Sequence, residues 1–229
     1  MLQRNGAVVR ADSAISRRHL LWTAGLTALG ATGLTGCSNG ESAEAEDDNL
    51  GFAGVVLGYP LARPTVDFVD TSGEAYNVSE RTAGKLTLML FGYTSCPDVC
   101  PVHLSVISNA LEKVPGPAAK TTVIMVGCDT ARDTPEVLRT YLDKRNEDFV
   151  GLTADATVID DVLEGLQLPP IVLEPPAADG SYVVGHPSQI LAYTPDDLCH
   201  ILYPFGVRAQ DWVKDLPRLQ TFDWPVTTR

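Results

Sequence analysis

The sequence predicts an α/β fold in which a central mixed sheet is flanked by helices. Two nearly continuous apolar runs, at residues 85–93 and 121–127, are typical of strands buried on both faces. Segments with the apolar spacing of a helix follow these runs. Near the end of the chain, two further apolar runs at 189–194 and 198–203 flank a turn and precede a last helical segment at 208–220. Alternating strands and helices, closed by a hairpin and a helix, indicate one α/β domain.

The first half of this domain begins with two short strands, expected at 65–69 and 75–78, which a turn at 71–74 joins. The buried strand at 85–93 follows. Apolar residues then recur with helical spacing over 102–114, and the string Pro115-Gly116-Pro117 ends that helix.

The second half starts from the buried strand at 121–127. Thr134 can cap the next helix, Pro135 suits its first turn and Glu136 favours the positive end of the helix dipole, so a helix should run to about Arg145. The remaining elements are a short strand at 149–152, a helix at 156–166, a proline-rich loop at 169–176 and a strand at 182–184. This order of elements is typical of the thioredoxin type of fold.

Composition excludes several classes of protein. Apolar residues make up 45% of the 229 residues and charged residues 20%, which is ordinary for a globular protein. The formal net charge of −12 argues against general nucleic-acid binding, because a phosphate backbone would be repelled. The five cysteines are too few for a disulfide scaffold at this length, so their positions decide how they are interpreted.

The first 36 residues are interpreted as a twin-arginine lipoprotein signal peptide. Arg17 and Arg18 precede an apolar run at 20–35, which is short for a membrane span. The run ends in Leu34-Thr35-Gly36-Cys37, which resembles a bacterial lipobox. That resemblance implies that Cys37 is lipidated and becomes the first residue of the mature chain. The alternative is an uncleaved membrane anchor, and either way the protein is exported and held at the outer face of the cytoplasmic membrane or in the periplasm.

Residues 37–60 are interpreted as the lipidated N-terminus and a flexible tether, and residues 61–229 as the folded domain. The segment 38–50 is small, polar and acidic, so it cannot bury enough surface to order itself. Removal of residues 1–36 would take away four Arg and one Asp, so the net charge of the mature chain would be −15.

A cysteine pair, Cys96 and Cys100, lies where the strand at 85–93 gives way to the helix at 102–114. Sites in α/β sheets gather at the carboxyl ends of strands, and a helix N-terminus favours thiolates. If the segment is helical, the two residues share one face of the helix. Their sulfur atoms could then bind one soft metal ion such as Cu(I), with a third ligand from elsewhere, or close a disulfide.

The candidates for a third ligand are histidines. Spacing alone does not choose between His103, one turn after Cys100, and His186, which lies between two expected strands. We expect His103 to be a solvated helix residue and His200 to be a packing or surface residue in its strand.

Three stretches of the chain resemble the Sco/SenC family of copper-binding, thioredoxin-like proteins. They read Phe91-Gly92-Tyr93-Thr94-Ser95-Cys96-Pro97-Asp98-Val99-Cys100-Pro101, Asp129-Thr130-Ala131-Arg132-Asp133-Thr134-Pro135-Glu136-Val137-Leu138 and Gly185-His186-Pro187-Ser188. They stand in the order and spacing of the family. The resemblance covers the chain from about residue 61 to its end.

The resemblance implies that Cys96, Cys100 and His186 bind copper, and that Asp129 supports the site as a neighbouring or partner-docking group. Two thiolates and an imidazole suit three-coordinate Cu(I), and can hold Cu(II) with an added ligand. The family usually has an acid before the histidine and Ser or Thr after it, whereas Gly185 and Pro187 stand there in this chain.

Two further cysteines, Cys128 and Cys199, are additions to the family pattern. We interpret both as small buried apolar residues. The alternative for Cys128 is a thiol near the metal that competes for it or resolves a disulfide.

Two functions follow from the resemblance. The first is a membrane-tethered copper chaperone that assists assembly of the copper site of cytochrome c oxidase, with the copper-containing oxidase subunit and other copper carriers as partners. The alternative is a thiol–disulfide oxidoreductase that uses Cys96 and Cys100 to keep the cysteines of a client protein reduced.

Overall fold

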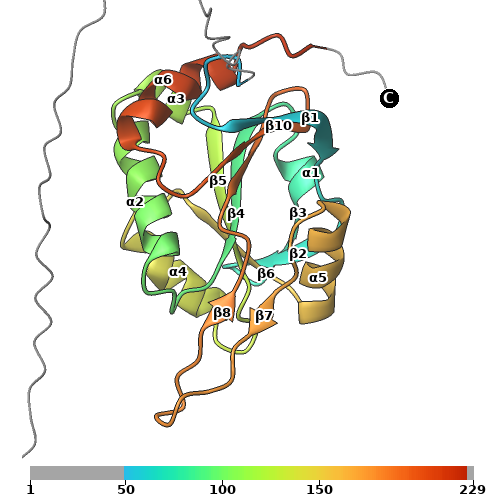
Figure 1. The fold of residues 1–229 in the computed structure, drawn as a ribbon, viewed down its shortest axis with the longest axis vertical. Helices are drawn as coiled ribbons and strands as arrows, with labels where there is room; N and C mark the ends of the chain where they lie inside the picture. The colour runs from blue at the N-terminus through green and yellow to red at the C-terminus, as the bar shows by residue number, and fades with distance from the viewer. Residues whose placement is uncertain (1–48, 226–229) are drawn as a thin grey trace, which may run out of the picture. The chain divides into compact units, whose positions relative to one another are not determined.

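The computed structural model describes residues 49–225, and its ribbon is drawn in Figure 1. The expected signal peptide, Cys37 and the first part of the expected tether lie outside the described residues. None of the helices within 49–225 has the length and apolar character needed to cross a bilayer.

An eight-stranded mixed sheet forms the centre of the described part of the chain. The order of its strands is β1-β10-β9-β4-β5-β6-β2-β3, and β7 pairs with β8 in a separate small ladder. The strands are β1 (Val55–Ala62), β2 (Asp67–Asp70), β3 (Ala75–Asn77), β4 (Leu86–Gly92), β5 (Thr121–Gly127), β6 (Val150–Thr153), β7 (Val172–Leu173), β8 (Val184–Gly185), β9 (Ile190–Tyr193) and β10 (Leu198–Tyr203). The helices are α1 (Val78–Arg81), α2 (Val99–Leu111), α3 (Pro115–Ala118), α4 (Pro135–Asp143), α5 (Ala156–Gly165) and α6 (Ala209–Leu219). The predicted α/β class with a mixed sheet and flanking helices is confirmed.

The central strand β4 separates two hydrophobic cores. Leu88 and Leu90 point to the side covered by α2, α4 and α6, whereas Met89 and Phe91 point to the side covered by α1 and α5 (Figure 1). All seven residues of β4 are buried. The continuous apolar sequence of this strand therefore has a direct cause, since both of its faces lie under helices.

β4 and β5 run parallel and in register, from Leu86 opposite Thr121 to Gly92 opposite Gly127. Their carboxyl ends therefore meet at one edge of the sheet. The turn that follows β4 and the first turn of α2 carry the cysteine pair, and the loop that follows β5 carries Cys128 and Asp129. The fold thus brings two of the three family-like stretches to the same edge.

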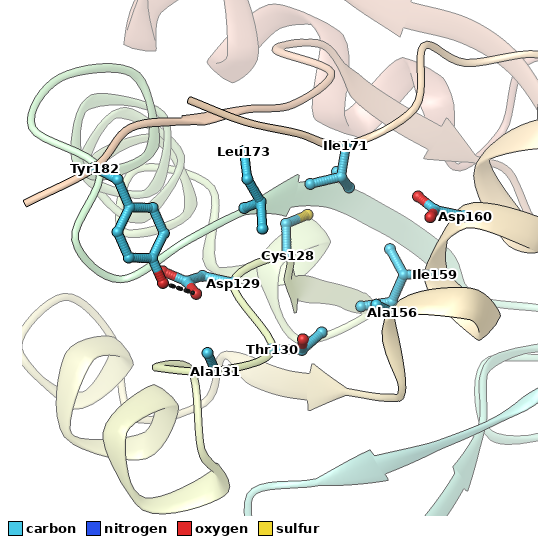
Figure 2. Close-up of a pocket in the computed structure, with 10 residues that line it drawn as sticks. All are labelled: Cys128, Asp129, Thr130, Ala131, Ala156, Ile159, Asp160, Ile171, Leu173 and Tyr182. Carbon is cyan, nitrogen blue, oxygen red and sulfur yellow. Dashed lines mark hydrogen bonds between the residues drawn. The ribbon is translucent and has the colours of Figure 1, made fainter. Parts of the chain in front are cut away.

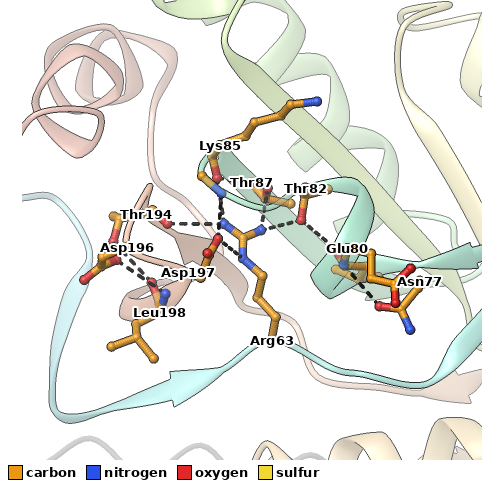
Figure 3. Close-up of polar contacts among 12 residues, drawn as sticks. Arg63, Asn77, Glu80, Thr82, Lys85, Thr87, Thr194, Asp196, Asp197 and Leu198 are labelled. Carbon is orange, nitrogen blue, oxygen red and sulfur yellow. Dashed lines mark hydrogen bonds and ion pairs between the residues drawn. The ribbon is translucent and has the colours of Figure 1, made fainter.

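The other end of β4 is fixed by a buried arginine. Arg63 is 4% exposed and donates hydrogen bonds to hydroxyl and carbonyl oxygens around it, while its Nε lies 3.2 Å from a carboxylate oxygen of Asp197. Its hydrogen-bond acceptors are Thr82 Oγ1, Thr87 Oγ1, the Lys85 carbonyl and the Thr194 carbonyl (Figure 3). This network joins the segment after β1 to the start of β4 and the turn between β9 and β10, so it anchors the end of the sheet opposite the cysteine pair.

Strand β1 is the main departure from the expected elements. It pairs with β10, with an irregularity between Val56 and Leu61, and it begins inside the range 37–60 that was expected to be tether. The ordered fold therefore starts before residue 61. Gly58 and Pro60 interrupt the apolar pattern of this strand, which is why its sequence does not look like one.

Candidate metal centre

The cysteine pair is held by a turn and by the first residues of α2. The amide of Cys96 donates to the Tyr93 carbonyl at 3.1 Å, which closes a turn directly after β4. α2 begins at Val99, so Cys100 lies in its first turn while Cys96 precedes it. Cys96 is half-buried and Cys100 is only 1% exposed. The pair is therefore formed by a turn and a helix together and does not lie on one helix.

His186 joins this pair from the loop between β8 and β9. The Sγ atoms of both cysteines and a ring nitrogen of His186 all lie within 4.8 Å of one another. The Nε2 of His186 lies 3.6 Å from the Cys100 Sγ. Among residues 49–225, this is the one such group of three or more histidines, cysteines or carboxylates. The three ligands implied by the resemblance are thus brought together although 86 residues separate Cys100 from His186.

A backbone contact sets which nitrogen of His186 faces the sulfurs. Its Nδ1 lies 2.9 Å from the Pro187 carbonyl oxygen. A carbonyl oxygen only accepts, so Nδ1 carries the proton and Nε2 keeps its lone pair. The Tyr93 ring meets the imidazole edge to face, with the ring centroids 5.6 Å apart. The imidazole is therefore oriented as a metal ligand, in the way that hydrogen bonds orient ligating histidines in metalloproteins.

The electrostatics of the pair favour a metal over a free thiolate at Cys100. Burial, with a smaller contribution from the neighbouring Cys96, raises the pKa of Cys100 above that of an ordinary thiol. The thiol is protonated at neutral pH, and a bound cation would displace its proton. Two sulfurs and one imidazole nitrogen are a soft donor set, which fits Cu(I).

Asp129 lies outside this group and contacts the segment that leads to His186. It is 2% exposed and accepts a hydrogen bond from the Tyr182 hydroxyl at 2.9 Å (Figure 2). It also forms an ion pair with Arg132. The Arg132 guanidinium also lies over the Tyr182 ring, 3.7 Å from its centroid. Tyr182 stands two residues before β8. Asp129 therefore contacts the segment that leads into β8 and from there to His186, and its burial does not suit direct docking of a partner.

Asp133 performs a similar task for the cysteine loop. One of its carboxylate oxygens accepts from the Thr94 amide at 3.0 Å and from the Thr94 hydroxyl at 2.7 Å. The other accepts from the amide of Asp129 at 3.2 Å. Burial raises the pKa of this carboxyl. The loops after β4 and β5 are thus tied together next to the cysteine pair, a role for Asp133 that the sequence alone did not indicate.

His103 was expected to be solvated, and that expectation is wrong. Its side chain is 5% exposed, because α2 packs this face against the loop after β8, and its Nε2 lies 2.8 Å from the Ser188 carbonyl oxygen. His200 is a packing residue, as expected: its ring stacks on Trp224 with centroids 4.5 Å apart, and it pairs with Asp196.

Both additional cysteines are buried, as the simpler interpretation expects. Cys199 is fully buried in β10, and burial raises its pKa to about 12. Cys128 is 4% exposed, and burial raises the pKa of its thiol as well. It lines a cavity of about 140 Å³ between the loop after β5, the start of α5 and the β7–β8 segment (Figure 2). It is not a member of the group formed by the other three side chains.

The fold and the site together define a thioredoxin-like domain with a Cys-Cys-His group that could hold a soft metal ion at the carboxyl edge of its sheet. Comparison with known proteins identifies the family of this domain. Residues 62–221 match the SCO1/SenC family model, and the chain belongs to that family. One solved structure with this fold is BsSco, a member of the Sco family of cytochrome c oxidase assembly proteins, which is 18% identical with a TM-score of 0.55 over 73% of this chain and 99% of that one.

Individual relatives agree with this assignment. An SCO2-like protein of Rickettsia prowazekii is 33% identical over 122 residues, which are 53% of this chain and 59% of that protein. The structure of Bradyrhizobium japonicum ScoI with copper bound is 30% identical, with a TM-score of 0.58, and the match covers 71% of this chain and 99% of that one. The apo Sco1 protein of Thermus thermophilus is 27% identical, with a TM-score of 0.63, over 73% of this chain and 96% of that one. The chain spans less than two thirds of the length of the curated relatives it matches.

Proposed function

We propose that this protein is a copper carrier that assists assembly of the copper site of cytochrome c oxidase. The observation that carries the proposal is the group formed by Cys96, Cys100 and His186, whose donor atoms lie within 4.8 Å of one another. The copper-bound structure of the Bradyrhizobium japonicum relative supports copper as the metal. The copper-containing oxidase subunit would receive the metal, and other copper carriers would supply it.

Each residue of the group has a distinct part in the proposed carrier. Cys96 and Cys100 would bind Cu(I) as thiolates, and the Nε2 of His186 would complete a three-coordinate site. Cu(II) would need an added ligand. The hydrogen bond from His186 Nδ1 to the Pro187 carbonyl keeps the imidazole oriented before the metal arrives.

The proposal includes attachment to a membrane through Cys37 at the outer face of the cytoplasmic membrane or in the periplasm. The signal-like segment before Cys37 and the lipobox-like Leu34-Thr35-Gly36 support it. In the source organism, wild-type protein should sediment with membranes and the Cys37→Ala variant should appear in the soluble exported fraction. Equal partition of the two would contradict lipid attachment at Cys37.

Copper titration of residues 37–229 under reducing conditions tests the proposed metal function. One Cu(I) per chain should bind in competition with a chromophoric Cu(I) chelator. Cys96→Ala or Cys100→Ala should abolish that binding. Cys199→Ala is the matched control for Cys100→Ala. Cys199 is also buried, is not in the group and pairs with Tyr193, which lies opposite Thr87 near the start of β4, so this variant should still bind one Cu(I). Full binding by both site variants would refute the proposal.

The alternative is a thiol–disulfide oxidoreductase. The unequal exposure of the two thiols supports this alternative, because it leaves one of them accessible to a client disulfide. The half-buried Cys96 would attack a client disulfide as a thiolate, forming a mixed disulfide and releasing one client thiolate, which takes up a proton. Cys100 would then lose its proton and displace the second client thiol, so that the client gains two electrons and Cys96–Cys100 becomes a disulfide. A thiol reductant outside the chain must restore the pair.

His186→Ala discriminates between the two functions. A copper carrier should lose Cu(I) affinity in this variant, because the third donor is gone. An oxidoreductase should keep its rate of reduction of a model disulfide, since neither sulfur is altered. A variant that keeps wild-type copper affinity and disulfide exchange would favour the oxidoreductase.

A further inference from the structure

His103 is a buried side chain that the proposed copper chemistry does not use. It lies one helical turn after Cys100 on α2, so the two residues share a face of the helix. Its ring meets the Phe205 ring edge to face, with centroids 5.4 Å apart. Burial lowers the pKa of the imidazole below its usual value of 6.5. A buried imidazole needs a hydrogen-bond partner for its N–H group.

That partner is the backbone of the loop that carries His186. The Nε2 of His103 lies 2.8 Å from the Ser188 carbonyl oxygen. The carbonyl can only accept, so Nε2 carries the proton and donates it to this bond. Ser188 lies two residues after His186. α2 therefore supports the group in two ways: it carries Cys100, and its His103 contacts the loop that carries His186.

The loop has unequal support on its two sides. After Gln189 the chain enters β9, which pairs with both β4 and β10 inside the main sheet. Before His186 it leaves β8, whose only ladder is a pairing of two residues with β7. A loop that strand pairing holds well at one end only depends on side-chain contacts for its position, as the contact between Tyr182 and Asp129 shows on the β8 side. The His103 bond fixes it at Ser188, between His186 and β9.

We infer that His103 is a positioning residue that holds the His186 loop at the correct distance from Cys96 and Cys100. The inference rests on the proposed copper function and concerns geometry rather than ligation, since His103 is not in the group of donor atoms. Residues that orient a metal ligand in this way typically change metal affinity by about 10–100-fold when they are replaced.

Two variants with the same amide chemistry and different reach test this role. In His103→Gln the side-chain nitrogen can occupy the position of Nε2 and donate to the Ser188 carbonyl. In His103→Asn the nitrogen stops near the position of Nδ1 and does not reach. Cu(I) affinity should stay near the wild-type value in His103→Gln and fall about tenfold or more in His103→Asn. The thiolate-to-Cu(II) charge-transfer bands should shift only in His103→Asn.

A second measurement needs no metal. In the apo protein, amide hydrogen exchange at residues 186–190 should accelerate in His103→Asn and remain slow in His103→Gln. His200→Asn is the matched control, because His200 is an equally buried histidine whose polar contact, with Asp196, lies outside the loop. It should leave the loop exchange and the copper spectrum unchanged.

The outcomes separate this inference from the function on which it rests. A wild-type protein that binds no copper refutes the proposed function, and the exchange data still decide whether His103 holds the loop. Equal copper affinity and equal loop exchange in His103→Gln and His103→Asn overturn the inference while the copper function stands. Equal losses in His200→Asn also overturn it, because the effect would then be one of general stability.

Discussion

Gly92→Ala should damage the metal centre without removing any of its three donor residues. Gly92 is the last residue of β4, and its missing side chain leaves room for Cys100. A Cβ atom at this position would lie 2.7 Å from the Cys100 Sγ and 3.3 Å from the Met125 Cε. Ordinary van der Waals contact begins near 3.4 Å, so the sulfur would have to move by about 0.7 Å. Metal–ligand distances tolerate changes of only about 0.2 Å.

The expected effects on stability and on copper binding differ in size. Overpacking a core costs about 1–3 kcal/mol, and replacing a strand glycine by alanine returns about 0.5–1 kcal/mol, so the free energy of unfolding should fall by at most about 2.5 kcal/mol. The protein should remain folded, whereas Cu(I) affinity should fall at least tenfold, as it does when supporting groups of metal sites are lost.

Chelator competition measures the affinity and urea denaturation measures the stability. Gly165→Ala is the matched control: Gly165 ends α5, no atom lies within 4 Å of its added Cβ, and its effect on both quantities should be small. A Gly92→Ala protein with wild-type copper affinity and an unchanged Cu(II) spectrum would refute the argument that this glycine makes room for the Cys100 sulfur.

Three other predictions concern parts of the fold around the site. Arg63→Met should lower the free energy of unfolding by roughly 3 kcal/mol in urea, because buried oxygens lose their donors, but leave the copper spectrum of the folded protein unchanged. The lowered pKa of His103 means that the unfolded chain takes up its proton first as the pH falls below 6.5, so stability should decrease over that range. Urea denaturation of the apo protein at pH values on both sides of 6.5 should show a shallower decrease in His103→Gln. Tyr182→Phe, which loses the bond to Asp129, should accelerate amide exchange at 184–188, whereas Tyr59→Phe, at an exposed tyrosine, should not.

The elements that could be predicted from sequence are those with local signals. The runs that became β4 and β5 are apolar because both faces are covered, and Thr134 accepts a hydrogen bond from the Val137 amide at the start of α4, as the capping prediction requires. β1 was missed because its stability comes from pairing with β10, about 140 residues later in the chain, rather than from its own residues.

The site also has one part that local sequence predicts and one part that depends on contacts between distant residues. The spacing of Cys96 and Cys100 identifies a pair, but nothing local chooses His186 over His103. That choice depends on how the β8–β9 loop meets α2, a contact between residues more than 80 positions apart. The same contact explains why His103 is buried, against expectation. The β8–β9 loop covers its face of α2, and that loop lies far from α2 in the sequence, so the residues around His103 give no sign of it.

The exposure of the three donors bears on which function the site serves. Cys100 lies beneath the surface, whereas Cys96 and His186 are half-buried, so a ligand from another protein can approach a bound ion from their side. Structural zinc sites, by contrast, are usually closed by four protein ligands. Accessibility of Cys96 serves an oxidoreductase equally well, since an attacking thiolate also needs an open path.

The two functions differ in what they require of the histidine. Disulfide exchange needs no third donor, but here the bond from Nδ1 to the Pro187 carbonyl leaves the Nε2 lone pair facing the Cys100 sulfur. The prepared nitrogen therefore supports the proposed copper carrier over the oxidoreductase, and the two half-buried donors are compatible with the proposed transfer of the ion to another protein.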